Sequence, residues 1–277
     1  MKGNVQQPTS TAWWFLGLIV AWAAVVVISL NLCGDGFLHA EAHTYLAHHL
    51  SPRPVFELVF DNAVCEGGLR ARELSHGFDW IDSRFIGWST QHGHPHFFSL
   101  SHYLFHLVAG VSAWGFCVNY LRLPKFATFG FVMLIWTSPS AILYTSFFRS
   151  SKAGVFMLVF VAAWLWSVIQ EKPNSCRNLA TQAGLALVLF SMTCFDEQGL
   201  FILGVGCLFL LWIKHVQGLA EDGRVWLVAM GSLIAAVCYR WFGARALTLW
   251  LGGGGALRIR HGHTALGRGA QQHQSSY

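Results

Sequence analysis

Long apolar stretches dominate the pattern of hydrophobic and polar positions along the chain. A helix rises about 1.5 Å per residue, so crossing a hydrocarbon core of roughly 30 Å takes about 20 mostly apolar residues. Up to seven stretches approach this length: about Ala12 to Cys33, Phe97 to Leu121, Phe126 to Phe148, Ala153 to Gln170, Leu179 to Phe195, Leu200 to Ile213 and Val225 to Phe242. We therefore predict an all-α fold, a polytopic transmembrane helix bundle.

Three of these stretches have features beyond their apolar length. The first, Ala12 to Cys33, carries no charge and is longer than the core of a cleavable signal peptide, so we interpret it as a retained anchor. The fifth and sixth are short and flank Asp196 and Glu197. We expect them to meet at the membrane surface or to form one interrupted helix pair.

A long polar segment, Gly34 to Pro95, separates the first stretch from the second. Within its part Leu69 to Phe85, apolar residues recur every three or four positions: Leu74, Phe78, Ile81 and Phe85. Charged residues are expected to point elsewhere: Arg70, Glu73, Asp79 and Arg84. This predicts an amphipathic helix on the bilayer surface, and Phe37 to Leu50 is a weaker second case that ends at two prolines.

Composition narrows the class of protein. Of 277 residues, 54% are hydrophobic and only 11% are charged, so a water-soluble globule is improbable. The net charge of +5 comes from scattered residues, and we expect membrane lipids as partners but no nucleic acid, with protein partners left open. Seven cysteines without paired zinc spacing predict no disulfide framework, although Cys33 with Cys65 is left open.

The distribution of cations predicts the orientation. With the N-terminus inside, short inner loops hold Arg122, Lys125, Lys172, Arg177, Lys214 and Arg224, and short outer loops hold only Arg149 and Lys152. The positive-inside rule then predicts a multi-pass protein of the cytoplasmic (inner) membrane with its N-terminus inside. Three polar elements fall on the outer side, where we expect them to meet: Gly34 to Pro95, Ser146 to Lys152, and Asp196 to Gly199.

We predict a single transmembrane domain over residues 1–251, with the outer loop at 34–95 carrying the interfacial helices. Residues 252–277 change abruptly to Gly, Arg, His and Gln, and we expect a flexible tail there. The abrupt change also fits a truncated or frame-shifted reading of a longer protein. The outer loop holds eight of the thirteen acidic residues, so chemistry is expected on that side.

Three outer elements carry candidate site residues. Asp35 follows the first span, and its carboxylate could accept a proton from a hydroxyl, or it is an ordinary turn acid. Arg149 and Lys152, at the start of a helix, form a phosphate cradle or a pair of interfacial cations. Asp196 and Glu197 pair with Arg149, Arg240 or a substrate, or lie at a hydrated hairpin tip.

Two further groups are open to two interpretations each. Arg70, Arg72 and Asp79, with their acidic neighbours, could hold sugar hydroxyls or a diphosphate, or form the hydrated face of an amphipathic helix. Five histidines could ligate a metal: His92, His94, His96, His102 and His106. The last two share a helix face, but no repeated His-x-x-His-His box is present, so the leading interpretation includes no metal ligand.

The chain resembles the GT-C class of membrane glycosyltransferases in three features. It has a single N-terminal span, an outer loop that begins with an acid, and further acids and cations in the short loops on the same outer side. That class includes protein mannosyltransferases and lipid A aminoarabinose transferases, and the resemblance covers about Thr11 to Phe242. It implies a polyprenyl-phosphate-linked sugar donor, a loop acid as base, and basic residues that receive the phosphate. At the loop acid Asp35, which is followed by Gly36, the Asp-Glu dipeptide typical of the mannosyltransferases is absent.

Carried onto this chain, the resemblance implies that Asp35 is the base, and the alternatives are Asp61, Glu66 and Glu41. It also implies that Arg149 and Lys152 bind the phosphate, because they are basic and not because they belong to a shared motif. The predicted function is transfer of a sugar from a polyprenyl-phosphate donor to an acceptor hydroxyl at the outer face. No cofactor is predicted with certainty, and a divalent cation is left open. The alternatives are a His-ligated membrane metalloenzyme or metal transporter, and a non-catalytic or truncated membrane subunit.

Overall fold

The computed structural model describes residues 9–32, 50, 55–59, 72–93, 100–138, 151–171, 176–216, 223–243 and 246. Over these residues the protein is helical and contains no strand, which confirms the all-α prediction. The helices are α1 (Thr9–Leu32), α3 (Val55–Val59), α4 (Glu73–Gln91), α5 (Leu100–Gly115), α6 (Lys125–Thr137), α8 (Ser151–Glu171), α9 (Cys176–Phe195), α10 (Glu197–Val216) and α11 (Gly223–Cys238). Two π-helical turns, η2 (Phe116–Tyr120) and η3 (Tyr239–Gly243), continue α5 and α11.

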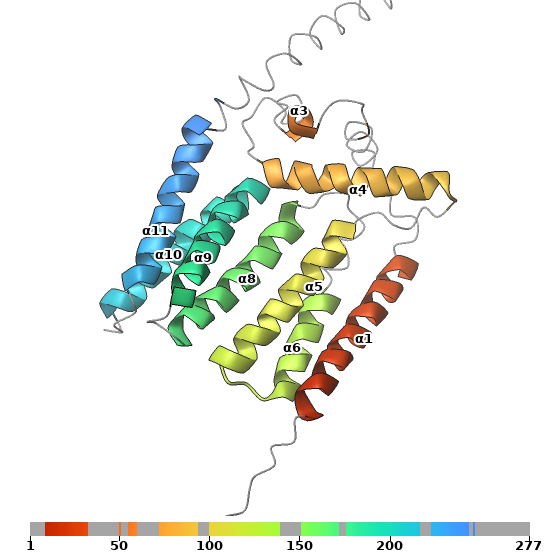
Figure 1. The fold of residues 1–277 in the computed structure, drawn as a ribbon, viewed down its shortest axis with the longest axis horizontal. Coiled ribbons are helices and arrows are strands. Elements are labelled where there is room, and N and C mark those ends of the chain that lie inside the picture. Colours follow the sequence, from red (N-terminus) through yellow and green to blue (C-terminus); the bar gives the residue numbers. More distant parts are fainter. Residues whose placement is uncertain are drawn as a thin grey trace, which may run out of the picture.

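Each of the seven predicted apolar stretches overlaps one of these helices, and the helices lie roughly side by side as a bundle (Figure 1). Among the described residues, two helical segments are both long and apolar enough to cross a membrane, Ser151–Gln170 and Val225–Gly243. Both segments meet this requirement by their length and composition. The second interfacial helix predicted at Phe37 to Leu50, the Cys33 and Cys65 pair and the tail 252–277 lie outside the described residues, apart from Leu50.

The bundle is held by apolar layers between neighbouring helices. One layer joins α1, α5 and α6 around Trp114, Val132 and Trp136. Gly110 of α5 makes this contact close, because a Cβ atom there would lie 2.4 Å from the Trp136 ring. A second layer joins α5, α8 and α9, and a third joins α9, α10 and α11.

Helix α4 lies across one end of the bundle, as Figure 1 shows. Leu74 and Phe78 pack against the layer that joins α5, α8 and α9, where the Phe78 ring meets those of Phe105 and Phe195 at centroid distances of 4.8 and 5.6 Å. Ile81 and Phe85 are instead exposed. The four apolar residues of the predicted amphipathic pattern therefore lie in two different environments.

Six polar residues of α4 are buried in the protein: Ser75, His76, Asp79, Asp82, Ser83 and Ser89. The interpretation of Asp79 and Asp82 as part of a hydrated face is therefore wrong. Burying a carboxyl group is unfavourable unless it is hydrogen-bonded or gives up its charge, so these residues need partners in the bundle.

Candidate functional site

The junction between α9 and α10 is a single non-helical residue, Asp196, whose side chain is buried. Its Oδ1 atom accepts a hydrogen bond from the backbone N–H of Gln198 at 3.0 Å, so Asp196 caps the first turn of α10. The backbone is tightly folded, since a Cβ atom at Gly199 would lie 2.1 Å from the carbonyl oxygen of Met192. The predicted meeting of the fifth and sixth stretches is thus a sharp, capped turn.

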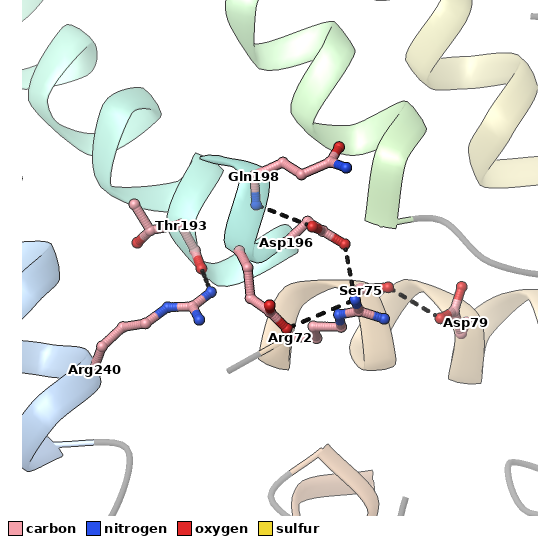
Figure 2. Close-up of polar contacts among 8 residues, drawn as sticks. Arg72, Ser75, Asp79, Thr193, Asp196, Gln198 and Arg240 are labelled. Atoms are coloured by element: carbon pink, nitrogen blue, oxygen red, sulfur yellow. Dashed lines mark hydrogen bonds and ion pairs between the residues drawn. The ribbon is translucent and has the colours of Figure 1, made fainter. Parts of the chain in front are cut away.

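Arg72, the residue before α4, is the ionic partner of this junction. Its Nη2 atom lies 3.2 Å from Asp196 Oδ2 and 3.8 Å from Glu197 Oε1. Figure 2 shows the guanidinium group of Arg72 below the junction, joined to Asp196, while Gln198 points away toward α8. The start of the cross-lying helix is therefore fixed to the α9–α10 turn by charge-assisted contacts.

Glu73 follows Arg72 and faces a different helix. Burial raises the pKa of its carboxyl group. Three contacts partly lower this pKa: a hydrogen bond to its own backbone, a hydrogen bond with Tyr239, and the charge of Arg240. Arg240 also donates from Nη2 to the Thr193 carbonyl oxygen at 2.6 Å. The first turn of α4 is thereby held by both the α9–α10 junction and η3.

Two further carboxyl groups of α4, those of Asp79 and Asp82, are buried. Ser75 donates from its hydroxyl to Asp79 Oδ2 at 3.1 Å. Asp82 accepts the backbone N–H of Ser101 at 3.0 Å and also the Ser101 hydroxyl, so it caps α5 from another helix. Burial raises the pKa of Asp82 to about 7, and the negative charge of Asp79 adds a smaller rise. The two hydrogen bonds from Ser101 lower this pKa but do not outweigh burial.

A groove of about 400 Å³ lies beside this polar region. Its polar lining comes from His106, Ser138, Lys152 and Gln198, and its apolar lining from Ala153, Val155, Phe156, Val159, Phe160 and Ile202. Lys152 and Gln198 are the second residues of α8 and α10, and Ser138 ends α6. Figure 1 shows the starts of α8 and α10 at the same end of the bundle as α4.

His106 is fixed within the wall of this groove. Its Nδ1 atom donates to the His102 carbonyl oxygen at 2.7 Å, and its own carbonyl oxygen accepts the Trp136 indole N–H at 2.7 Å. Because Nδ1 carries the proton in this bond, Nε2 is the ring nitrogen left for a ligand. His106 thus offers the groove a hydrogen-bond acceptor when the ring is neutral.

The structure brings together several of the residues predicted from the sequence. Arg72, Asp196 and Glu197 form one ionic group, and Lys152 lines the groove that Gln198 of the same junction also lines. Asp79 lies farther along α4, buried against Ser75. The predicted Asp35, Asp61, Glu66, Arg70 and Arg149, with Glu41, lie outside the described residues.

The proposed metal ligands are only partly described. His92 follows α4, is exposed and donates from Nδ1 to the Trp88 carbonyl oxygen at 2.7 Å, whereas His102 and His106 are buried in α5. Within the described ranges, no group of three or more His, Cys, Asp or Glu side chains is arranged to hold a metal ion. His94 and His96 lie outside those ranges.

Comparison with models of protein families, with curated proteins and with solved structures finds no match to this chain. The resemblance to the GT-C class therefore stays a prediction from the sequence. The geometry of the groove and of the ionic group beside it is the basis on which a function can be argued.

Proposed function

We propose that the chain is a multi-pass protein of the cytoplasmic membrane, N-terminus inside, and a GT-C-like glycosyltransferase. It transfers a sugar from a polyprenyl-phosphate donor to an acceptor hydroxyl at the outer face. The observation that carries this proposal is the groove, because a lysine and an amide lie at the helix-end side of a long apolar wall. A ligand with an anionic head and a hydrocarbon tail matches both parts.

The outer surface of the bundle supports the membrane part of the proposal. Large apolar side chains on several helices are open to the surroundings, such as Leu134 at 70%, Leu187 at 66% and Phe201 at 73% exposed. Leaving apolar surface in water costs about 25 cal/mol per Å², a cost that lipid removes. By length alone, α1, α9 and α10 also suffice to cross roughly 30 Å of hydrocarbon, with 24, 20 and 20 residues, although their apolar parts among the described residues are shorter.

The groove matches a lipid phosphate in detail. Lys152, Val155, Phe156, Val159 and Phe160 recur every three or four residues and therefore share one face of α8. This face extends about 12 Å at the rise of an α-helix. The Lys152 ammonium group attracts a phosphate, and the positive ends of the α8 and α10 dipoles add to that attraction. The prenyl chain would then lie along the phenylalanine and valine side chains.

The reaction that follows is a direct displacement. The acceptor hydroxyl oxygen bonds to the anomeric carbon of the sugar as the bond between that carbon and the phosphate oxygen breaks. The hydroxyl proton passes to an outer-loop carboxylate, Asp35, Asp61 or Glu66, and such help is worth about 10²- to 10⁴-fold in rate. The electron pair of the broken bond stays on the prenyl phosphate, whose charge Lys152 stabilises, together with Arg149.

The test is a transfer assay with the full chain in proteoliposomes and a panel of radiolabelled prenyl-phosphate pentoses and hexoses. Lys152→Ala should lower turnover about tenfold or more, because it removes charge stabilisation of the leaving group. The matched control is Lys125→Ala, which removes a lysine from the first turn of α6 at the opposite end of the bundle (Figure 1). Loss of transfer in both variants alike, or no transfer from any donor by the wild type, would contradict the proposal.

A further inference from the structure

We infer that Arg72 is a positioning residue of the groove and acts on it through Asp196. This inference rests on the proposed function, because it concerns how the groove comes to accept an anionic head. It begins from the two carboxylate oxygens of Asp196, which have different partners: Oδ1 accepts the Gln198 backbone N–H and Oδ2 faces Arg72.

The first partner links Asp196 to the lining of the groove. Gln198, the second residue of α10, is held by its backbone bond to Asp196, and its side chain extends toward α8 (Figure 2). The junction has little room to adjust, because the Gly199 Cα packs against the Met192 carbonyl group. A shift of Asp196 therefore shifts Gln198 and the polar end of the groove with it.

The second partner sets the charge beside that polar end. Asp196 is 3% exposed, so water does little to screen its negative charge. The Arg72 guanidinium balances that charge at 3.2 Å and also lies 3.8 Å from Glu197. Without Arg72, a buried carboxylate two residues from Gln198 would oppose the binding of a phosphate in the same groove.

The two contacts connect helix α4 to the groove. Arg72 immediately precedes α4, so any displacement of that helix along or across the bundle end moves the guanidinium relative to Asp196. The groove binds an anion more tightly when Arg72 is in place than when Arg72 is withdrawn. The cross-lying helix thus determines when the lipid phosphate can be held.

The test measures binding of farnesyl phosphate, a short prenyl phosphate, to the full chain in nanodiscs by isothermal titration calorimetry, with farnesol as the uncharged counterpart. Arg72→Gln should weaken farnesyl phosphate binding about tenfold and leave farnesol binding unchanged. Adding Asp196→Asn to Arg72→Gln should restore most of the lost affinity, because the opposing charge is gone while asparagine still caps α10. Arg84→Gln is the matched control, since Arg84 lies exposed on the same helix against the Trp80 ring.

The outcomes separate the two proposals. A double variant that binds as weakly as Arg72→Gln, or an equal loss of farnesol affinity, would show a purely structural role and overturn the inference. Wild-type affinity in Arg72→Gln would do the same while leaving the groove intact. If the wild type does not bind farnesyl phosphate, the proposed function fails and the inference falls with it. Should Arg72→Gln not fold, Arg72→Lys must retain the binding, and its loss there would also count against the inference.

Discussion

Replacing Asp82 with asparagine should remove a large pH dependence of stability. The side chain of Asp82, on α4, is almost completely buried and accepts two hydrogen bonds from Ser101. Asparagine cannot ionise, keeps an oxygen for the Ser101 backbone N–H, and presents an NH₂ group to the Ser101 hydroxyl, which can accept it. The variant therefore resembles the wild-type protein with Asp82 protonated.

The size of the effect follows from the pKa of Asp82, which burial raises from its ordinary value of 3.8 to about 7. Because the folded pKa lies above the unfolded one, the folded protein keeps a proton that the unfolded chain releases. The free energy of unfolding therefore falls as pH rises from about 4 to about 7 and is level above that range. Each pKa unit is worth about 1.4 kcal/mol, so the total fall is about 4 kcal/mol.

Thermal unfolding in detergent, followed by tryptophan fluorescence between pH 5 and pH 8, measures this difference. The stability advantage of Asp82→Asn over the wild type should grow by about 3 kcal/mol between pH 5 and pH 8. Taking the difference between the two proteins cancels other buried acids such as Glu73. Ser101→Ala should move the transition to higher pH, because it removes a bond to the charged form. Parallel pH profiles for wild type and Asp82→Asn would refute the reasoning.

Two shorter predictions concern the turn at Asp196 and the topology. Gly199→Ala should cost about 3 kcal/mol or more, because its Cβ would collide with the Met192 carbonyl group, whereas Gly204→Ala meets nothing within 4 Å and should be neutral or slightly stabilising in chemical unfolding. In a cysteine-free background, Gln91→Cys should react with an impermeant maleimide on intact cells, and Tyr120→Cys only after permeabilisation, since the two residues lie at opposite ends of the bundle (Figure 1). Labelling of both residues from outside would contradict the topology.

Apolar length and spacing were sufficient to predict the helices. A helix overlaps each of the seven stretches, because a long run of apolar residues with few turn residues favours a helix over a strand or a loop. The helix after Leu69 was also predicted, although it begins at Glu73 and continues to Gln91. Periodicity could not show what covers each face of that helix. Ser75, Asp79 and Asp82 form a polar stripe at helical spacing, and only the packed bundle reveals that this stripe faces inward.

The contacts of the site form between helices that are far apart in the sequence, so the partners of the site residues could not be predicted from local patterns. A partner for Asp196 was expected, but Arg72 lies more than a hundred residues away and was grouped with a hydrated surface. Glu73 was expected among the charged residues of the amphipathic segment, and Tyr239 was not singled out, because their contact forms only when α4 crosses η3. Gln198 was noted only as a neighbour of the acids, although it lines the groove with Lys152.

Photocrosslinking tests the central claim most directly. A farnesyl phosphate that carries a diazirine on its chain would be irradiated with the full protein in nanodiscs, and the modified peptides would be mapped by mass spectrometry. The account predicts adducts on the groove wall, at Val155, Phe156, Val159, Phe160 or Ile202, that excess farnesyl phosphate suppresses and Lys152→Ala reduces. Adducts spread over the outer faces of α1 and α11, unaffected by competitor or by Lys152→Ala, would contradict it.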